Sequence, residues 1–380
     1  MWALGCIMAE LVTGQSLFPE EDLCQQLIGI IDLLGIPDDV SLMPLGIDAG
    51  SPSKLREKVP EERLSPAGFD VLRGLLQYDP KDRLTAAAAL RMPCVESYRR
   101  LRKIGEVAFG AVSKARHVGT GEVVAIKSSR HSGSGGAALL LREAALLAAC
   151  RENPAVVRLL EVVRGSGMDD LHLVLEYVGP SLHDVIRRRG IPFTESEARR
   201  AMAQLLAGVG SMHADGIVHC DLKPGNVLVG EHDRRLKICD LGLARSAAAP
   251  PPDEQQVDGT VGYIAPEVLL CEKDCGAPVD MWALGCIMAE LVTGQSLFPE
   301  EDLCQQLIGI IDLLGIPDDV SLMPLGIDAG SPSKLREKVP EERLSPAGFD
   351  VLRGLLQYDP KDRLTAAAAL RMPWFAPMDD

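Results

Sequence analysis

An exact internal repeat constrains the organisation of this chain more than any other feature. Residues 1–93, from MWALGC to RMP, recur letter for letter at residues 281–373. Solenoid repeats diverge and come in several copies, so this repeat indicates a recent tandem duplication, or a gene-model error that would look the same. Because Met1 matches the internal residue Met281, the first copy starts in the middle of a folded unit. We therefore interpret residues 1–93 as a fragment.

The composition indicates a globular protein that does not bind polyanions. The chain has 380 residues, 47% of them hydrophobic, which is enough for one large or two modest domains. Its net charge of −15 argues against nucleic acid as a ligand. Ten cysteines form no CxxC pair and seven histidines form no HxxxH pair, so neither a zinc site nor a disulfide framework is indicated. We expect a reducing compartment, the nucleus or the cytoplasm.

The first eighteen residues, MWALGCIMAELVTGQSLF, are apolar enough to suggest a signal peptide or a membrane anchor. They lack a basic start, contain Glu10 and recur inside the chain. We therefore expect a displaced core helix and no membrane partner.

From about Tyr98 onward, strand patterns come first and helix patterns follow. Strand-like runs such as EVVAIK and LHLVLEYV alternate with the turn-rich GTGE and GSGM. Later, ARRAMAQLLAGVGSMH and GFDVLRGLLQ carry apolar residues at three- and four-residue spacing. This order predicts an α+β protein of two lobes, with a site between them.

Five motifs follow one another in this unit: IGEVAFGAV at 104–112, VAIK at 124–127, HCDLKPGNV at 219–227, CDLG at 239–242 and APE at 265–267. Their order and spacing resemble the protein-kinase set. Within kinases the chain is most similar to the cyclin-dependent group, and with it to the plant F-type kinases. YRRLRKIGEVAFGAV, REAALLAAC, KICDLGLAR, SLFPEEDLCQQLIGIIDLLGIPDD and QYDPKDRLTAAAAL carry this likeness.

The resemblance spans residues 98–376 and implies the two-lobed protein kinase fold. A small β-rich N-lobe would occupy residues 94–178, and a larger helical C-lobe residues 179–380. Residues 1–93 would be a non-catalytic partial repeat of the helical C-lobe, because they contain no nucleotide-binding lobe.

The resemblance also implies ATP and Mg²⁺ as cofactors. Lys127 would hold the α and β phosphates of ATP, and Glu143 would pair with Lys127, unless it is only an exposed helix charge. Asn226 and Asp240 would hold Mg²⁺, since hard oxygen ligands suit that ion. The residues implied to contact ATP are Ile104, Gly105, Gly110, Val112, Ala125, Lys127, Glu176, Val178 and Leu228.

Three further residues indicate the reaction and its acceptor. Asp221 would accept the proton of the substrate hydroxyl. Lys223, two residues after it, and Thr260, ahead of APE, form the pairing of serine/threonine kinases. We therefore expect Ser and Thr of protein substrates to be phosphorylated.

Three charged residues resemble structural contacts of the kinase C-lobe. Asp280 would brace the catalytic loop from below, and Glu267 would form an ion pair with Arg363. The alternative is that all three are ordinary surface charges.

The regulatory positions depart from the pattern of relatives. Cys220 stands where kinases activated by loop phosphorylation carry the Arg that grips the phosphate. Counting back from APE, the usual phosphorylated threonine falls on Gln255. The paired loss indicates that loop phosphorylation was abandoned, and Asp253 and Glu254 are candidates to imitate the phosphate charge for Arg142 and Arg245.

The glycine-rich loop and the neighbouring helix also differ. Val107 replaces the middle glycine, and its branched side chain is expected to weaken ATP binding. Ala108 and Phe109 replace the inhibitory Thr and Tyr, and Leu241 replaces the Phe of the magnesium motif without loss of packing.

Two further departures concern partners and substrates. SGSGGAALLLRE, at 132–143, replaces the helix that binds cyclin in relatives. We expect no strict need for a cyclin, although a cyclin stays a candidate partner. Ile264 replaces an Arg that shapes the pocket for a proline after the target residue, so we expect no strict preference for proline.

Two functions remain open on the sequence. The leading hypothesis is an active serine/threonine kinase, and the alternative is an ATP-binding pseudokinase that acts as a scaffold. Residues 1–93 would form a partial helical subdomain packed on the kinase, an aggregating surface, a swapped domain or, as we favour, a poorly docked remnant.

Overall fold

The structure is a computed structural model. It describes residues 1–19, 22–35, 53–60, 62–64, 66–80, 82–85, 95–107, 110–129, 134–164, 171–246, 259–271, 276–299, 302–315 and 332–376. Within these ranges, no helix combines the length and the apolar character needed to cross a membrane.

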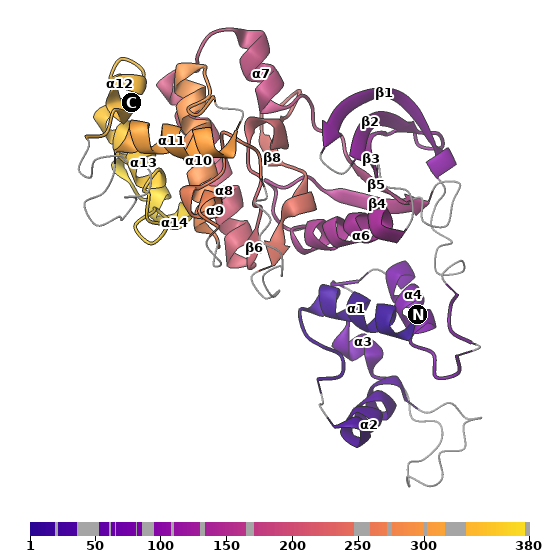
Figure 1. The fold of residues 1–380 in the computed structure, drawn as a ribbon. Coiled ribbons are helices and arrows are strands. Elements are labelled where there is room, and N and C mark those ends of the chain that lie inside the picture. The colour runs from indigo at the N-terminus through magenta and orange to yellow at the C-terminus, as the bar shows by residue number, and fades with distance from the viewer. Residues whose placement is uncertain are drawn as a thin grey trace.

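A five-stranded antiparallel sheet forms the N-lobe, in the order β1-β2-β3-β5-β4 (Figure 1). Its strands are β1 (Tyr98–Val107), β2 (Gly110–His117), β3 (Val123–Ser129), β4 (Leu159–Arg164) and β5 (Leu171–Glu176). Most of the run EVVAIK thus lies in β3 and most of LHLVLEYV in β5, as their β-branched and apolar residues predicted. Helix α6 (Ser134–Ala149) joins β3 to β4 and packs on the sheet.

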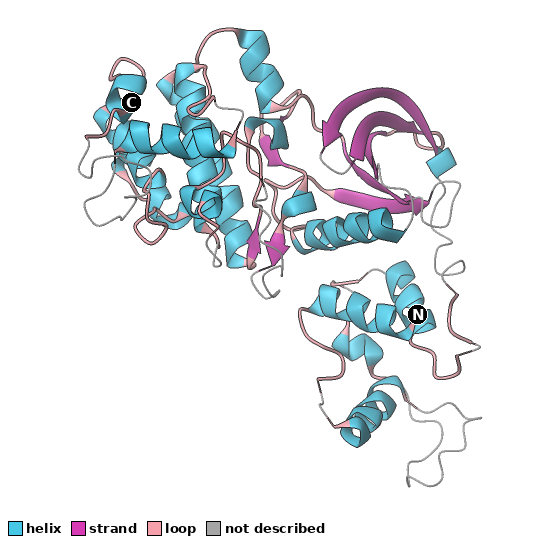
Figure 2. Cartoon of the chain, viewed as in Figure 1, coloured by secondary structure: helices cyan, strands magenta, loops and turns pink. Residues whose placement is uncertain are grey.

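The C-lobe is mostly helical (Figure 2). Its helices are α7 (Leu182–Arg189), α8 (Glu195–Ala214), α9 (Pro266–Leu269), α10 (Pro278–Thr293), α11 (Leu303–Leu314), α12 (Leu335–Lys338), α13 (Pro346–Leu355) and α14 (Ala366–Leu370). Short strand pairs join β6 (Ile217–Val218) to β9 (Arg245–Ser246) and β7 (Val227–Val229) to β8 (Leu236–Ile238). The predicted two-lobed α+β fold is confirmed.

Helix α10 forms the centre of this lobe. Every residue from Val279 to Val292 is buried, as expected for a helix that is apolar on all sides. It packs against α8 and α13. A Cβ added at Gly285 would lie 2.7 Å from Leu356 Cδ2, so glycine permits the close approach to the end of α13.

The described residues of the first copy of the repeat form helices that correspond to helices of the C-lobe. Helix α1 (Trp2–Thr13) repeats most of α10, while α2 (Leu23–Leu34), α3 (Leu55–Lys58) and α4 (Pro66–Leu75) repeat α11, α12 and α13. Trp2 stacks on Phe18 with ring centroids 6.0 Å apart, and Trp282 stacks on Phe298 at 5.9 Å. The copy buries a small core of its own, formed by Ala9, Leu17, Leu55, Val59, Leu72 and Leu76.

Candidate active site

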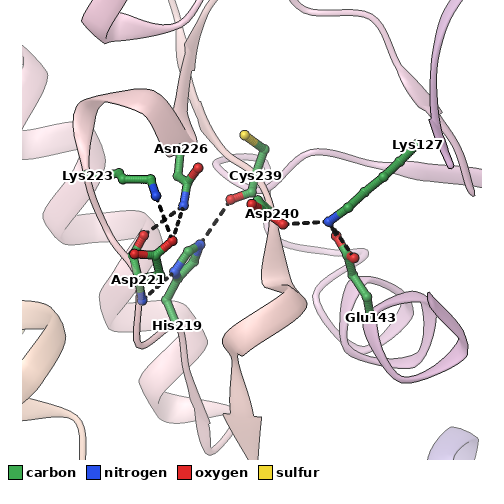
Figure 3. A network of polar contacts seen from close by, with 8 residues as sticks. All are labelled: Lys127, Glu143, His219, Asp221, Lys223, Asn226, Cys239 and Asp240. Atoms are coloured by element: carbon green, nitrogen blue, oxygen red, sulfur yellow. Dashed lines mark hydrogen bonds and ion pairs between the residues drawn. The ribbon is translucent and has the colours of Figure 1, made fainter. Parts of the chain in front are cut away.

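A buried charge cluster links the two lobes (Figure 3). Nζ of Lys127, on β3, donates to both carboxylate oxygens of Glu143, at 2.7 and 2.6 Å, and also to Oδ1 of Asp240. Lys127 and Glu143 are each only 3% exposed at their side chains. Glu143 is therefore not an exposed helix charge but the partner of Lys127.

Electrostatics keep Lys127 charged in this cluster. Burial by itself disfavours the ammonium, but the carboxylates of Glu143 and Asp240 together raise the pKa of Lys127 above its usual value. Burial also raises the pKa of Glu143, against the influence of Lys127. A fixed positive charge at this point suits the binding of phosphate oxygens.

The segment HCDLKPGNV, residues 219–227, corresponds to the catalytic loop that the resemblance implies, and it forms a second cluster around Asp221. Nζ of Lys223 donates to Asp221 Oδ2 at 2.9 Å, and the Thr260 hydroxyl donates to Asp221 Oδ1 at 2.6 Å. Lys223 also contacts the Thr260 hydroxyl. The Asn226 amide donates to the Asp221 carbonyl at 2.8 Å and to Oδ2 at 3.0 Å. The fold thus brings together four of the predicted site residues from two separate segments.

His219 connects the catalytic loop to the segment that carries Asp240. Its Nε2 lies 3.0 Å from the carbonyl oxygen of Cys239, and its Nδ1 accepts the N–H of Asp221 at 3.3 Å. Asp240 has φ of 64°, and the next residue, Leu241, is fully buried. Leu241 therefore fits the core as expected. We assigned no role to His219 from the sequence, although it begins the HCDLKPGNV motif.

Asp280 fixes the catalytic loop from α10. Its carboxylate accepts the backbone N–H of His219 at 2.8 Å and that of Cys220 at 2.9 Å. His213 Nε2, from α8, lies 2.8 Å from the same carboxylate, a contact that the sequence analysis missed. These bonds hold Cys220 at φ 65°, and they confirm the bracing contact predicted for Asp280.

The second predicted structural pair also forms. Arg363 donates to both carboxylate oxygens of Glu267, at 2.7 and 2.9 Å. The two side chains are almost completely buried, and Arg363 also donates to the Pro278 carbonyl. The pair ties the APE segment to the helical lobe.

The predicted ATP contacts lie on five strands, β1, β2, β3, β5 and β7, and on the segment after β5. Val112 on β2 pairs with Gly105 on β1 and with Lys127 on β3. Ile104, Val112 and Val178 pack on the buried cluster that includes Ala125. Leu228 lies on β7, opposite Lys237.

Two of the predicted ATP contacts have specific surroundings. A Cβ at Gly110 would lie 2.1 Å from the Ser128 carbonyl oxygen, so only glycine fits there. The Glu176 carboxylate accepts the N–H of Arg158 at 2.7 Å and also contacts Lys237. The contact of all these residues with ATP stays a prediction.

Several regulatory positions fall outside the described residues. Ala108, Phe109, Asp253, Glu254 and Gln255 are among them, and at Val107 only the backbone is described, paired with Gly110. Arg142 is described: it donates to the carbonyl oxygen of Ala244 at 2.9 Å. Helix α6 is thereby tied to the segment that follows Asp240.

The metal ligands predicted from the resemblance suit magnesium. Because the Asn226 amide nitrogen donates to Asp221, its Oδ1 is the oxygen left to act as a ligand. Asp240 supplies a carboxylate. Mg²⁺ is bound by one or two such oxygens together with phosphates and water. Across the described ranges, no three His, Cys, Asp or Glu side chains cluster as a metal cage.

Comparisons with known proteins agree with this geometry. The protein kinase domain model matches residues 1–95 and 98–375. The chain is 48% identical over 303 residues to cyclin-dependent kinase F-2 of Oryza sativa subsp. japonica, covering 75% of this chain and 91% of the relative.

Two other relatives are more distant. Cyclin-dependent kinase B2-1 of Arabidopsis thaliana is 37% identical over 303 residues, with 75% of this chain and 96% of the relative covered. Cyclin-dependent kinase G-2 of Oryza sativa subsp. indica is 38% identical over 298 residues, which cover 74% of this chain and 42% of the relative. The chain therefore belongs to the protein kinase family, as a serine/threonine kinase of the cyclin-dependent kinase-like type.

Proposed function

We propose that this chain transfers the γ-phosphate of ATP to Ser or Thr hydroxyls of protein substrates, with Mg²⁺, and needs no phosphorylated activation loop. The observation that carries the proposal is that Lys127 contacts Glu143 while Lys223 and Thr260 both contact Asp221, so the residues of the proposed reaction are brought together by contacts within the chain. The two lobes of the kinase would be residues 94–178 and residues 179–380. Residues 1–93 would be a non-catalytic addition.

Each described contact has a part in the proposed reaction. Asp221, held by Lys223 and Asn226, accepts the proton of the substrate hydroxyl, and Thr260 fixes the second carboxylate oxygen. Lys127 neutralises phosphate charge. Asn226 and Asp240 would hold Mg²⁺, which would supply positive charge against the negative charge that develops on the transferred phosphate.

Two contacts support independence from loop phosphorylation. The thiol of Cys220 offers no cation for a phosphate, and the loop is already fixed through its backbone N–H to Asp280. Arg142 donates to a backbone carbonyl, at Ala244. Both contacts are made between groups of the chain itself.

A second candidate, an ATP-binding pseudokinase that acts as a scaffold, is favoured by Val107. A β-branched residue in place of glycine keeps the backbone of the loop away from the phosphates. Binding of ATP and Mg²⁺ without transfer would distinguish this candidate. The cysteine pattern supports the nucleus or cytoplasm as the place of action for either candidate.

The test is phosphate transfer from labelled ATP with Mg²⁺ to a mixed Ser/Thr peptide pool by the phosphatase-treated full-length chain. Asp221→Asn should lower the rate by at least about 100-fold, whereas Asp233→Asn, at an exposed turn, should leave it unchanged. Label on tyrosine, or activity that needs prior loop phosphorylation, would contradict the proposal. If wild type and both variants stay at background even with added cyclins, while ATP still binds, the pseudokinase is the answer.

A further inference from the structure

Helix α1 has an exposed apolar face, and the same face is completely buried in α10, the helix that contains the same sequence. Leu4, Ile7 and Leu11 follow one side of α1 and are 50%, 52% and 55% exposed. Their counterparts in α10, Leu284, Ile287 and Leu291, are all fully buried. The two helices share one sequence, so the difference comes only from what surrounds them. An exposed row of large apolar side chains indicates a surface that a partner covers.

The C-lobe shows which kind of helix α10 packs on. Helix α10 packs on α8, whose buried side consists of small and apolar residues such as Ala198, Ala201, Leu205 and Val209. Among the described residues before Tyr98, no helix repeats α8, since the repeated segment matches residues 281–373. A substitute must therefore be another helix with an alanine- and leucine-rich side.

Helix α6 offers such a side, and α1 lies against it (Figure 1). The outward stripe of α6 consists of Ala138, Leu141, Ala145 and Ala148, at helical spacing and without charge. Leu141 is 43% exposed, and Ala145, in the middle of the stripe, is half-buried. Just beyond α6, Arg151 donates a hydrogen bond to the Glu62 carbonyl oxygen of the first copy.

The opposite side of α6 carries the active-site contacts. Glu143 reaches Lys127 and Arg142 reaches the Ala244 carbonyl. A helix that moved outward would break both contacts. Whatever covers its outward stripe therefore also holds the charge cluster together.

We propose that the first copy of the repeat is a built-in docking partner of α6: from its position beside α6, helix α1 closes further, so that its half-exposed apolar face covers the outward stripe of α6 and holds Glu143 against Lys127. This replaces our expectation of a poorly docked remnant. The effect on catalysis rests on the proposed kinase activity, whereas the docking does not.

Hydrogen exchange of the full-length chain tests the docking. Ile7→Glu places a charge in the α1 face, and the amides of α6 should then exchange several-fold faster. Ala145→Glu, on the facing stripe, should speed the exchange of α1 in return. Ile28→Glu is the matched control, because Ile28 is 56% exposed on α2, away from α6 in Figure 1.

The docking would be overturned if the amides of α6 exchanged at the same rate in Ile7→Glu as in wild type. It would also be overturned if the exchange of α6 rose as much in Ile28→Glu as in Ile7→Glu. If Ile7→Glu unfolds the whole first copy, the Ala145→Glu variant decides, and unchanged exchange of α1 there overturns it as well. Phosphate transfer is the separate readout of the catalytic effect, and should fall several-fold in Ile7→Glu alone. A wild type without phosphate transfer would refute the proposed function. The hydrogen-exchange result would still test the docking by itself.

Discussion

Leu4 and Leu284 occupy the same position of the same 93-residue sequence, yet Leu4 is half exposed and Leu284 is completely buried. Their helices have the same residues on every side, and both end at a glycine in the left-handed conformation, Gly14 and Gly294. The two leucines therefore have the same local sequence and differ in burial, so comparing them isolates the effect of burial.

Truncating the two leucines should have very different effects. Leu284→Ala removes packed atoms from the centre of the C-lobe and should lower the free energy of unfolding by about 2–5 kcal/mol. Leu4→Ala should lower it by about 1 kcal/mol or less, because Leu4 is half exposed where α1 lies beside α6. Urea unfolding of the full-length variants measures both. Equal losses would mean that the face of α1 is buried in solution to the same extent as that of α10.

Replacing Glu143 by Gln should lower the rate of phosphate transfer by about 100-fold, because Lys127 would then be drawn to Asp240 alone and displaced. The thermal midpoint should change little by comparison. Steady-state kinetics check this beside Glu122→Gln, an exposed glutamate of the same lobe. A variant as active as wild type would show that the ion pair does not position Lys127.

Asp280→Asn should destabilise the C-lobe by about 1.5–3 kcal/mol, because at least one buried hydrogen bond to a charged acceptor is lost. Asn keeps one acceptor oxygen but turns an NH₂ group towards donors from His219 or Cys220. Chemical unfolding provides the measurement, with Asp350→Asn, an exposed aspartate of α13, as the control. Similar losses in both variants would argue against the bracing role.

The N-terminus of α8 should give the chain a stability contribution that depends on pH. Hydrogen bonds from Arg189 and the Thr194 N–H lower the pKa of Glu197 from 4.5 to about 2. Since the pKa is lower in the folded state, this contribution is complete above about pH 5 and is lost as pH falls towards 2.

The measurement is the difference in urea midpoint between wild type and Glu197→Gln. That difference should be largest near neutral pH and should shrink steadily from about pH 5 to pH 3. Placing both in an Arg189→Gln background removes the main partner and should flatten the trend. A difference that stays constant with pH would show that Glu197 contributes no charged contact.

Much of the fold followed from local patterns. The alternation in EVVAIK and the helical spacing in ARRAMAQLLAGVGSMH correspond to β3 and α8. The contact of Glu143 with Lys127 and that of Glu267 with Arg363 were also predicted, as what the resemblance to protein kinases implies.

Other contacts were not predictable in this way. The bond from His213 to Asp280 joins residues 67 positions apart, and the bond from Arg142 to Ala244 joins residues 102 apart. Neither belongs to a spacing pattern, because each depends on how whole helices pack against distant segments.

By itself the sequence determined the local structure of both copies of the repeat, since identical residues have identical helix and turn preferences. It also determined the family and the residues of the candidate site. Only the tertiary structure decided in which copy the face of Leu4, Ile7 and Leu11, or of Leu284, Ile287 and Leu291, is buried. The described part of the chain contains one helix α8, and α10 packs on it. The apolar face is therefore buried in α10, whereas the same face of α1 lies half exposed beside α6.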